Sequence, residues 1–471
     1  MKYDKIYIDG EWVKPSTSDV IEVENPATEE IFTTVAKANS EDVDKAVEAA
    51  ARAFKSFNET SYEERQKYVE EILNGIKERQ EDFEKVIRQE LGSSYNYTKS
   101  AQVEQVIKEM TLALENADKV KFTEHHEGFD LVREGVGVVA AVTPWNFPLN
   151  QIQRKLTCLL LAGATVVLKP STKTPVSAFL LAEVIDKTSL PKGVFNIVPG
   201  SGSEVGDALT GHEKVDMISF TGSTKVGRGI YEQAKSNIKN IHLELGGKSP
   251  NILLPKGDAK RAVKQSMDAI INNAGQACSA LTRLIVPESR LEEVEGYVKQ
   301  YVEENVRVGN PEDENNTIGP VVSKEAQDRV YDYIESGKQE ATLLIGGGRV
   351  ESEDKGYYVE PTVFTKVDNK TKIAQEEIFG PVLSIITYND VDEAIEIAND
   401  TTYGLYGAVF GENDEEAYDV AKKLRTGSII INGAARNPAA PFGGYKQSGI
   451  GKEIGWIGIE EYTETKVLFK E

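Results

Sequence analysis

The sequence has few cysteines and histidines, and each shortage excludes a class of protein. Only two cysteines, Cys158 and Cys278, occur among 471 residues, which is too few for a disulfide framework. The four histidines are scattered and show no spacing typical of a zinc site. We therefore predict a chain without structural disulfides and without a bound metal.

Long apolar runs are also missing. The longest nearly apolar segment, residues 156–168, is too short to span a bilayer, which takes roughly 20 apolar residues. Charged residues from Asp4 to Glu11 interrupt the N-terminus, so it has no apolar stretch typical of a signal peptide. We expect a cytoplasmic protein that does not associate with membranes.

Basic residues are outnumbered. The 76 acidic and 54 basic residues give a formal net charge of -22, which would repel a phosphate backbone. We therefore expect no nucleic-acid partner, and we interpret the acidity as a well-solvated surface.

The first half of the chain combines helices with short buried strands. A helix is expected at 41–57, capped by Ser40, and the capping box Ser61/Glu64 begins a helical region that ends near Gly92. Apolar, β-branched runs then alternate with helical segments, and they predict strands at 136–142, 164–168, 194–198 and 215–220. This alternation is typical of a parallel sheet with helices on both faces, the Rossmann-type architecture that binds dinucleotides.

After Pro250 a second alternating region begins. Strands are expected at 281–286, 343–346, 382–387 and 428–432, with helices at 392–398 and 414–424 among them. The fold class is therefore α/β, with a second α/β domain behind the first.

Two glycine-containing segments could bind a dinucleotide phosphate. The series Gly200, Gly202, Gly206 has one residue too many for the dinucleotide fingerprint, so we interpret it as a strand-to-helix turn. The segment 218–228 is the stronger candidate, because a strand runs into Gly222 and Ser223, where a helix can begin and expose backbone N–H groups to a pyrophosphate. An ordinary capped helix explains the same residues equally well.

Seven short motifs occur along the chain and are best interpreted together. In chain order they are TPWNFP at 143–148, LKPS at 168–171, FTGS at 220–223, LELGGKSP at 243–250, GQAC at 275–278, EEIFGP at 376–381 and PFGGYKQSG at 441–449. Each motif is weak alone, but together and in this order they are very specific. The chain resembles the aldehyde dehydrogenase superfamily over essentially its whole length.

The resemblance implies a reaction and its catalytic residues. An aldehyde would be oxidised to a carboxylic acid with NAD(P)+ and water, without acylation of coenzyme A. Cys278 would be the nucleophile that carries the thioester. The side-chain amide of Asn146 and the backbone N–H of Cys278 would receive the oxyanion, and Glu244 would activate water as general base. Cys158, inside an apolar run, is expected to be a buried hydrophobe instead.

The resemblance also implies a cofactor site. Lys169 would reach the adenosine ribose, Ser223 the pyrophosphate, and Glu377 the nicotinamide ribose. NAD-preferring relatives often carry a glutamate where this chain has Thr172, so NADP stays open beside NAD. The predicted cofactor-binding residues are Trp145, Lys169, Ser171, Thr172, Gly222, Ser223, Glu377 and Phe379.

Two polar residues follow the first motif. Gln151 and Arg154 stand where many relatives line the substrate tunnel with apolar side chains, which suggests a polar or anionic aldehyde. Arg154 could equally pair with an acidic neighbour.

The resemblance divides the chain into three parts. Residues 1–121 and 136–248 would form the cofactor-binding domain, and residues 249–454 the catalytic domain. Residues 122–135 and 455–471, the second of which ends in an alternating strand pattern at 463–469, would form a small β arm that joins a homodimer or homotetramer.

Three other functions compete with this one. A cysteine hydrolase or acyltransferase would need a base beside Cys278, usually histidine, but no histidine lies in a recognisable partner motif. Coenzyme-A-acylating relatives generally lack the water-activating glutamate, which is present here as Glu244. A catalytically silent protein would have lost the nucleophile or the oxyanion donor, and Cys278 and Asn146 are both present.

Overall fold

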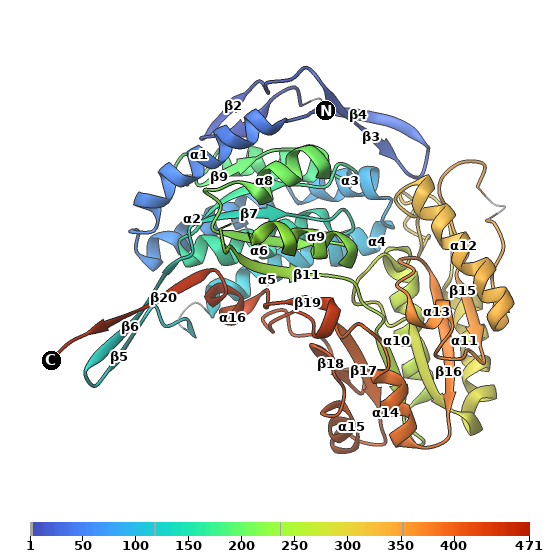
Figure 1. Ribbon diagram of the computed structural model, residues 1–471. Coiled ribbons are helices and arrows are strands. Elements are labelled where there is room, and N and C mark those ends of the chain that lie inside the picture. Colours follow the sequence, from blue (N-terminus) through green and yellow to red (C-terminus); the bar gives the residue numbers. More distant parts are fainter. Residues whose placement is uncertain (1–2, 117–118, 236, 351–352) are drawn as a thin grey trace.

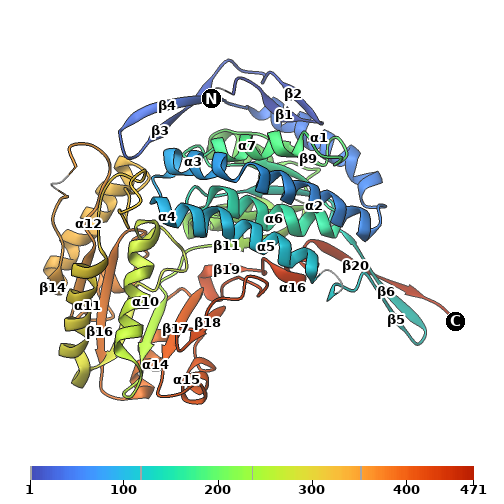
Figure 2. The same cartoon turned by 180° about the vertical axis from the view of Figure 1, so that it is seen from behind.

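The computed structural model describes residues 3–116, 119–235, 237–350 and 353–471, and it confirms the predicted alternation of strands and helices. Figure 1 shows two α/β lobes and a slender arm that extends away from both. The chain ends at the tip of this arm (Figures 1 and 2).

The first lobe is built on a six-stranded sheet, parallel except at one edge. Each strand predicted in the first half is present to within about two residues, the usual uncertainty of element boundaries. In spatial order the strands are β19 (Gly449–Ile450), β11 (Asn240–Glu244), β10 (Met217–Thr221), β7 (Val138–Val142), β8 (Thr165–Lys169) and β9 (Phe195–Ile197).

Alternate residues of these strands face two separate apolar clusters, as a sheet covered on both faces requires. One face packs against α6 (Pro148–Ala162), α7 (Val176–Ile185) and, beyond them, α2 (Tyr62–Glu78), α3 (Gln80–Leu91) and α5 (Glu104–Glu115). The other face packs against α1 (Ser40–Phe57), α8 (Asp207–Gly211) and α9 (Thr224–Ala234).

Two details of the predicted helices differ from expectation. Helix α1 is capped by Asn39, whose side chain accepts hydrogen bonds from the backbone N–H groups of Glu41 and Asp42, so Ser40 is the first helical residue and not the cap. The helical region after Ser61 is confirmed with its capping box, but it breaks at Arg79 into α2 and α3.

The second lobe contains a seven-stranded sheet whose strands are parallel except β14. In spatial order they are β14 (Thr342–Ile345), β15 (Thr362–Thr365), β16 (Val382–Tyr388), β13 (Arg283–Pro287), β12 (Pro250–Leu253), β17 (Tyr406–Phe410) and β18 (Ser428–Ile431). The helices are α10 (Ala259–Ile271), α11 (Leu291–Asn305), α12 (Lys324–Glu340), α13 (Lys372–Gln375), α14 (Val391–Asn399) and α15 (Asp414–Ala421).

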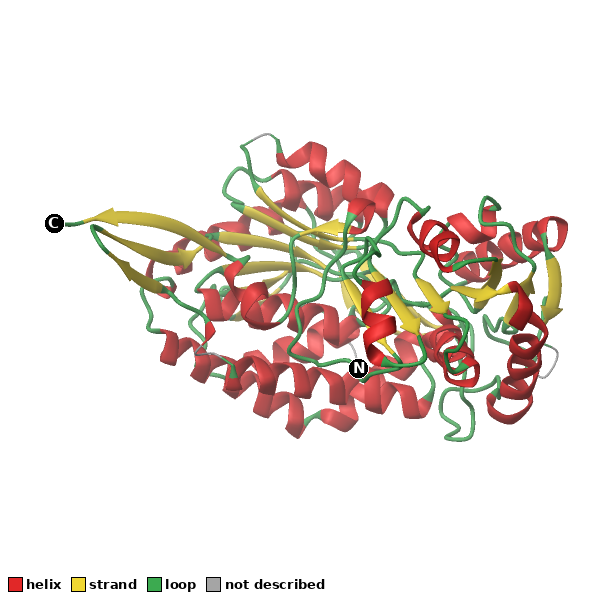
Figure 3. Cartoon of the chain, turned by 90° about the horizontal axis from the view of Figure 1, so that it is seen from below, coloured by secondary structure: helices red, strands yellow, loops and turns green. Residues whose placement is uncertain are grey.

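The arm consists of β5 (Thr123–His126), β6 (Phe129–Gly135) and β20 (Thr463–Phe469), paired in the order β20-β6-β5. Residues far apart in sequence therefore lie side by side, and Figure 3 shows the three strands extending beyond the helices. The strand predicted at 463–469 is confirmed, whereas the residues before it form the short helix α16 (Gly455–Glu460).

Two N-terminal hairpins complete the fold: β1 (Ile6–Ile8) with β2 (Glu11–Val13), and β3 (Val20–Asn25) with β4 (Glu30–Ala36). The turn after β3 touches the second lobe, where the N–H of Tyr357 donates to the carbonyl of Pro26 at 2.9 Å. The chain also returns to the first sheet through β19, before the predicted domain boundary at residue 454. Within the described residues, every helix is too short or too polar to cross a bilayer.

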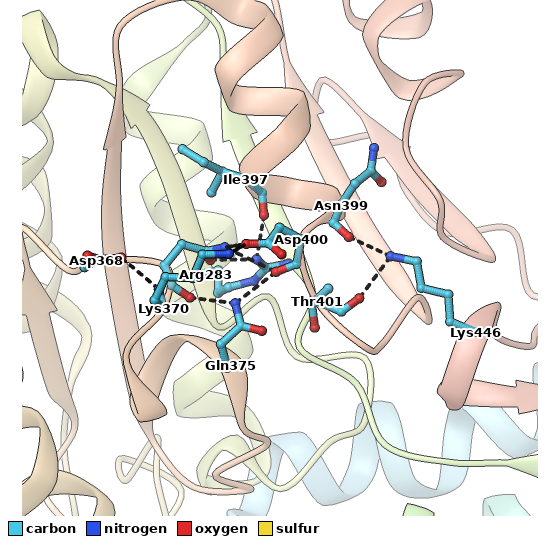
Figure 4. Close-up of polar contacts among 10 residues, drawn as sticks. Arg283, Asp368, Lys370, Gln375, Ile397, Asn399, Asp400, Thr401 and Lys446 are labelled. Carbon is cyan, nitrogen blue, oxygen red and sulfur yellow. Dashed lines mark hydrogen bonds and ion pairs between the residues drawn. The ribbon is translucent and has the colours of Figure 1, made fainter.

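A buried arginine connects separate segments of the second lobe by hydrogen bonds (Figure 4). Arg283, at the start of β13, is fully buried and donates from Nε to the carbonyl of Lys248 at 3.0 Å. Its two terminal nitrogens donate to the carbonyls of Ile397 and Ala398, each at 2.9 Å, and to Oδ1 of Asn369 at 3.1 Å. The guanidinium thus links the end of the LELGGKSP motif to the end of α14.

Lys446 holds the segment after α14 from the other side. Its Nζ donates to the carbonyl of Asn399 at 2.7 Å and to that of Thr401 at 3.1 Å (Figure 4). The PFGGYKQSG motif is thereby attached to the loop that leads into β17.

We expect Arg283→Leu to lower the free energy of unfolding by about 3 kcal/mol, because three buried acceptors and one part-buried acceptor would lose their donor. Arg307→Leu is the matched control: Arg307 is exposed, also donates to backbone carbonyls, and should change stability by less than about 0.5 kcal/mol. The comparison is made by thermal unfolding. Equal losses of stability would show that burial of these bonds is unimportant.

Candidate active site

Two cavities meet at Cys278. The first, of about 140 Å³, lies at the carboxyl ends of the strands of the first sheet, where parallel α/β sheets bind ligands. It is lined by Pro144, Trp145, Asn146, Gln151, Thr221, Gly222, Ser223, Glu244, Leu245, Gly246, Cys278, Arg329, Glu377 and Phe379. The second, of about 270 Å³, is lined by Tyr97, Ser100, Ala101, Gln105, Phe147, Asn150, Gln151, Arg154, Ala277, Cys278, Ser279, Arg436 and Phe442.

The loop that carries Cys278 has an unusual backbone. After α10, residues Asn273 and Ala274 each have a φ of 52°, and Gly275 has a φ of 71°. A Cβ on Gly275 would lie 2.2 Å from the carbonyl oxygen of Gly380, so only glycine fits there. This close contact sets the cysteine loop directly against the EEIFGP motif.

Gln276 and Asn146 stabilise the cysteine loop. The side chain of Gln276 accepts from the N–H of Val322 and donates to the carbonyl of Asn273, both at 2.9 Å. Asn146 is 4% exposed, and its Nδ2 donates to the carbonyl of Gln276 at 2.9 Å. An amide nitrogen has two protons, so this bond leaves one that can serve a ligand in the cavity.

Glu244 stands at the end of β11 and is buried. It is 2% exposed, and among the described residues neither of its carboxylate oxygens has a hydrogen-bond partner. His242 Nε2 lies 3.7 Å from Oε1. Burial, and then the charge of Glu453, raises the pKa of Glu244 well above its usual range, while Lys155 and Lys452 oppose the shift. A carboxylate in such a site is a strong proton acceptor.

Cys278 is only partly exposed and faces both cavities. Its backbone is packed against the strand end that carries Glu244, because a Cβ on Gly247 would lie 2.3 Å from the carbonyl oxygen of Cys278. Burial, followed by the charges of Glu377 and Glu244, raises the pKa of the Cys278 thiol to about 12. The resting sulfur is therefore a thiol that needs a proton acceptor before it can attack.

This raised pKa predicts how the free enzyme reacts with iodoacetamide. Because only the thiolate is alkylated, the rate for Cys278 should keep rising above pH 9, the pKa of an unperturbed thiol, without levelling off. Mass spectrometry of the peptide that contains Cys278 measures the rate, and the Cys278→Ser variant supplies the background. A plateau below pH 9 would contradict the expectation.

The predicted cofactor residues divide into two groups. Trp145, Gly222, Ser223, Glu377 and Phe379 line the first cavity together. The rings of Trp145 and Phe379 meet edge to face, with centroids 5.3 Å apart. Ser223 caps α9 by accepting from the N–H of Val226, which confirms the predicted helix start. Burial raises the pKa of Glu377 to about 7, although its Oε1 accepts from the N–H of Gly247 at 3.0 Å.

The other three lie outside this lining. Lys169 ends β8, and its Nζ donates to the carbonyl of Pro170 at 3.0 Å; burial lowers its pKa to about 8. Ser171 and Thr172 follow it and are half-buried. The strand-to-helix connection predicted at 200–206 is present, but Gly202–Gly206 already form a π-helical turn that continues into α8. A Cβ on Gly206 would contact the Lys169 side chain at 3.6 Å.

Arg154 has the acidic partner that the sequence left open as an alternative. It lines the second cavity, where its Nη2 and Nε lie 2.7 and 3.0 Å from the two carboxylate oxygens of Glu109 on α5. Both side chains are buried. Gln151, the other predicted substrate residue, lines both cavities.

Three charged residues at the site were missed by sequence reasoning. Arg329 lines the first cavity, and its Nη2 donates to the carbonyl of Glu377 at 2.6 Å. Arg436 lines the second cavity, and Glu109 pairs with Arg154. None belongs to a motif. The only signal was that Arg436 is a lone charged residue in the small-residue segment before PFGGYKQSG.

Two further predictions concern Cys158 and metal-ligating side chains. Cys158 is buried in α6, as predicted, and burial raises its pKa to about 12. In the part of the chain that the structure describes, His, Cys, Asp and Glu side chains form no group of three or more that could hold a metal ion.

Comparison with known proteins agrees with this geometry. The model of the aldehyde dehydrogenase family matches residues 12–468. A solved cysteine-to-alanine variant of aldehyde dehydrogenase C from Pseudomonas syringae, in complex with NAD+ and octanal, is 44% identical. It superposes with a TM-score of 0.97 over 99% of this chain and 96% of that one.

Two further solved structures are similar. An aldehyde dehydrogenase from Mycobacterium tuberculosis in complex with NAD+ is 42% identical, with a TM-score of 0.97 over 100% of this chain and 99% of that one. Betaine aldehyde dehydrogenase from Staphylococcus aureus, also with NAD+, is 38% identical, with a TM-score of 0.95 over 99% and 94%. The predicted α/β fold, with an NAD-binding and a catalytic domain, is that of these enzymes, and the chain belongs to the aldehyde dehydrogenase family.

Proposed function

We propose that this chain oxidises an aldehyde to a carboxylic acid with NAD+ and water, through a thioester on Cys278. The observation that carries the proposal is that Cys278 opens to two cavities, one of which also contains Asn146 and Glu244. One cavity can then receive the cofactor and the other the aldehyde.

The side chains can perform each step in turn. The Cys278 thiol gives up its proton to solvent water, and the sulfur attacks the aldehyde carbon. The aldehyde oxygen becomes an alkoxide that the Asn146 amide and the Cys278 N–H can stabilise. Bound NAD+ supplies the acceptor for the hydride that the substrate carbon releases. Glu244 then takes a proton from water, the water oxygen adds to the thioester, and the Cys278 sulfur leaves as the acid forms.

The lining of the first cavity suits the pyrophosphate and the nicotinamide ribose of a dinucleotide. Its lining combines the N-terminus of α9, where Ser223 and free N–H groups can bind a pyrophosphate, with the Glu377 carboxylate, which can accept from ribose hydroxyls. Lys169, Ser171 and Thr172 at the end of the neighbouring strand β8 would hold the adenosine half. NADP stays an alternative, because Thr172 carries no charge to repel a 2′-phosphate and Lys173 follows it.

We further propose that the substrate is a polar or anionic aldehyde. We also propose that the protein works in a reducing compartment such as the cytoplasm, and that it forms a homodimer or a homotetramer. The second cavity has polar and cationic walls. Both cysteines are free thiols, which fits the cytoplasm. The arm strand β20 presents Val467, Leu468 and Phe469 to solvent, the last 86% exposed, and a second copy could cover them.

An aldehyde panel assayed with each cofactor tests the proposal. Reduced nicotinamide absorbance should rise with NAD+ in the absence of coenzyme A, and an acid should form in equal amount. Dependence on added coenzyme A would identify the acylating reaction instead. Ester hydrolysis without any nicotinamide reduction on the panel would identify a cysteine hydrolase.

A further inference from the structure

The second cavity contains two arginines whose charges are balanced differently. Arg154 lies against Glu109, which also accepts hydrogen bonds from Gln105, Asn150 and Gln153. All of these hydrogen bonds to the Glu109 carboxylate come from residues around the cavity. Burial raises the pKa of Glu109, but the charge of Arg154 and its hydrogen bond lower it, and the pKa stays below the usual range. Arg154 and Glu109 together contribute no net charge to the cavity.

Arg436 is the unbalanced group. It follows β18, is exposed, and its guanidinium lies 4.9 Å from the ring centroid of Phe442. Among the described residues, no Asp or Glu lies within ion-pair distance of it. Arg154 lies 5.5 Å from the same ring, so Phe442 separates the neutralised guanidinium from the free one.

The same cavity reaches the nucleophile. Cys278 is part of its lining, and the charge of Arg436 acts on the thiol, where it opposes the larger effects of burial, Glu377 and Glu244 on the pKa. An aldehyde bound with its carbonyl at Cys278 would therefore extend its tail towards a cation. A carboxylate matches the planar, two-pronged geometry of a guanidinium better than any neutral group.

We infer that Arg436 selects aldehydes whose tail ends in a carboxylate, by binding that carboxylate at the mouth of the second cavity. The inference rests on the proposed aldehyde oxidation and names the substrate class of the same site. Arg154, whose charge Glu109 already neutralises, shapes the wall beside it.

The test compares kcat/KM for ω-carboxy aldehydes of increasing length with that for neutral aldehydes of the same length. The wild-type ratio should exceed one and should peak at the length that spans Cys278 and Arg436. Arg436→Leu should lower the ratio about fivefold, mainly through KM, as expected for loss of an exposed ion pair. Arg436→Lys should fall between, because lysine keeps the charge but loses the two-pronged geometry.

Arg425→Leu is the matched control. Arg425 is also exposed and also lies over an aromatic ring, 5.8 Å from the centroid of Tyr445, but it lines neither cavity. Its replacement should leave the ratio unchanged. Added salt should lower the wild-type ratio and not that of Arg436→Leu, because an exposed ion pair is screened.

The outcomes separate this inference from the proposed function. If neutral aldehydes are oxidised and Arg436→Leu and Arg425→Leu have the same ratio as the wild type, the selection by Arg436 is wrong and aldehyde oxidation stands. If a neutral polar tail is preferred to a carboxylate of equal length, the inference is also wrong. If the wild type reduces neither NAD+ nor NADP+ with any aldehyde of either series, the proposed function itself fails.

Discussion

Replacing Cys278 by serine should lower kcat/KM for every oxidised aldehyde by at least about a thousandfold. A serine hydroxyl occupies the same place between the two cavities, but it is a far weaker nucleophile and forms an ester instead of a reactive thioester. The measurement is steady-state reduction of NAD+ on the best aldehyde of the panel, with binding of NAD+ followed separately to show that the fold is kept.

Cys158 supplies the internal control for this loss. It is buried in α6 and lines neither cavity, so Cys158→Ala removes the only other thiol without touching the proposed chemistry. Its activity should stay within about threefold of the wild type, since a small change in packing costs stability more than rate. Retained activity in Cys278→Ser, or an equal loss in both variants, would show that the reaction does not pass through Cys278.

Replacing Glu244 by glutamine should separate the two halves of the reaction. Formation of the thioester consumes one equivalent of NAD+, whereas its hydrolysis needs a base that glutamine cannot provide. We expect the steady-state rate to fall by about a hundredfold to ten-thousandfold, with a burst of reduced nicotinamide close to one equivalent per site. Rapid-mixing absorbance measures the burst, and intact-protein mass spectrometry measures the acyl adduct.

The pH profile gives this prediction a second check. The pKa of Glu244 is raised by burial and by Glu453, so wild-type hydrolysis should increase with pH through a range above that of an ordinary carboxyl, as the residue becomes a carboxylate. The Glu244→Gln variant should lack that limb. Glu464→Gln, an exposed change on β20, should keep it. A Glu244→Gln variant with full turnover and no adduct would exclude Glu244 as the base.

Local patterns account for most of the secondary structure. The strand at 136–142 begins slightly later, as β7, because Gly137 has a φ of 120° and turns the chain before the regular strand. The capping box consists of Ser61 and Glu64, which are only three positions apart, so the sequence alone reveals it. Asn39 and Ser40 are both good caps, and only the observed hydrogen bonds distinguish them.

The candidate site was partly predictable for the same reason. Trp145, Asn146, Gly222, Ser223, Glu244, Cys278, Glu377 and Phe379 lie in short motifs and line one cavity. Arg329 and Arg436 reach the site from helices and loops whose local sequence is unremarkable for any function. No local pattern could show that Arg154 is paired with Glu109, because the two residues lie on different helices, α6 and α5.

What the sequence by itself determined is the order of strands and helices, the family and the residues of the motifs, because these depend on neighbours along the chain. What only the tertiary structure decided is which charges meet. Glu109 neutralises Arg154 while Arg436 stays free beside Phe442, and Glu453 raises the pKa of Glu244 from more than two hundred residues away. Coulomb interactions act through space, so the charge of the substrate cavity depends on the packing of distant elements.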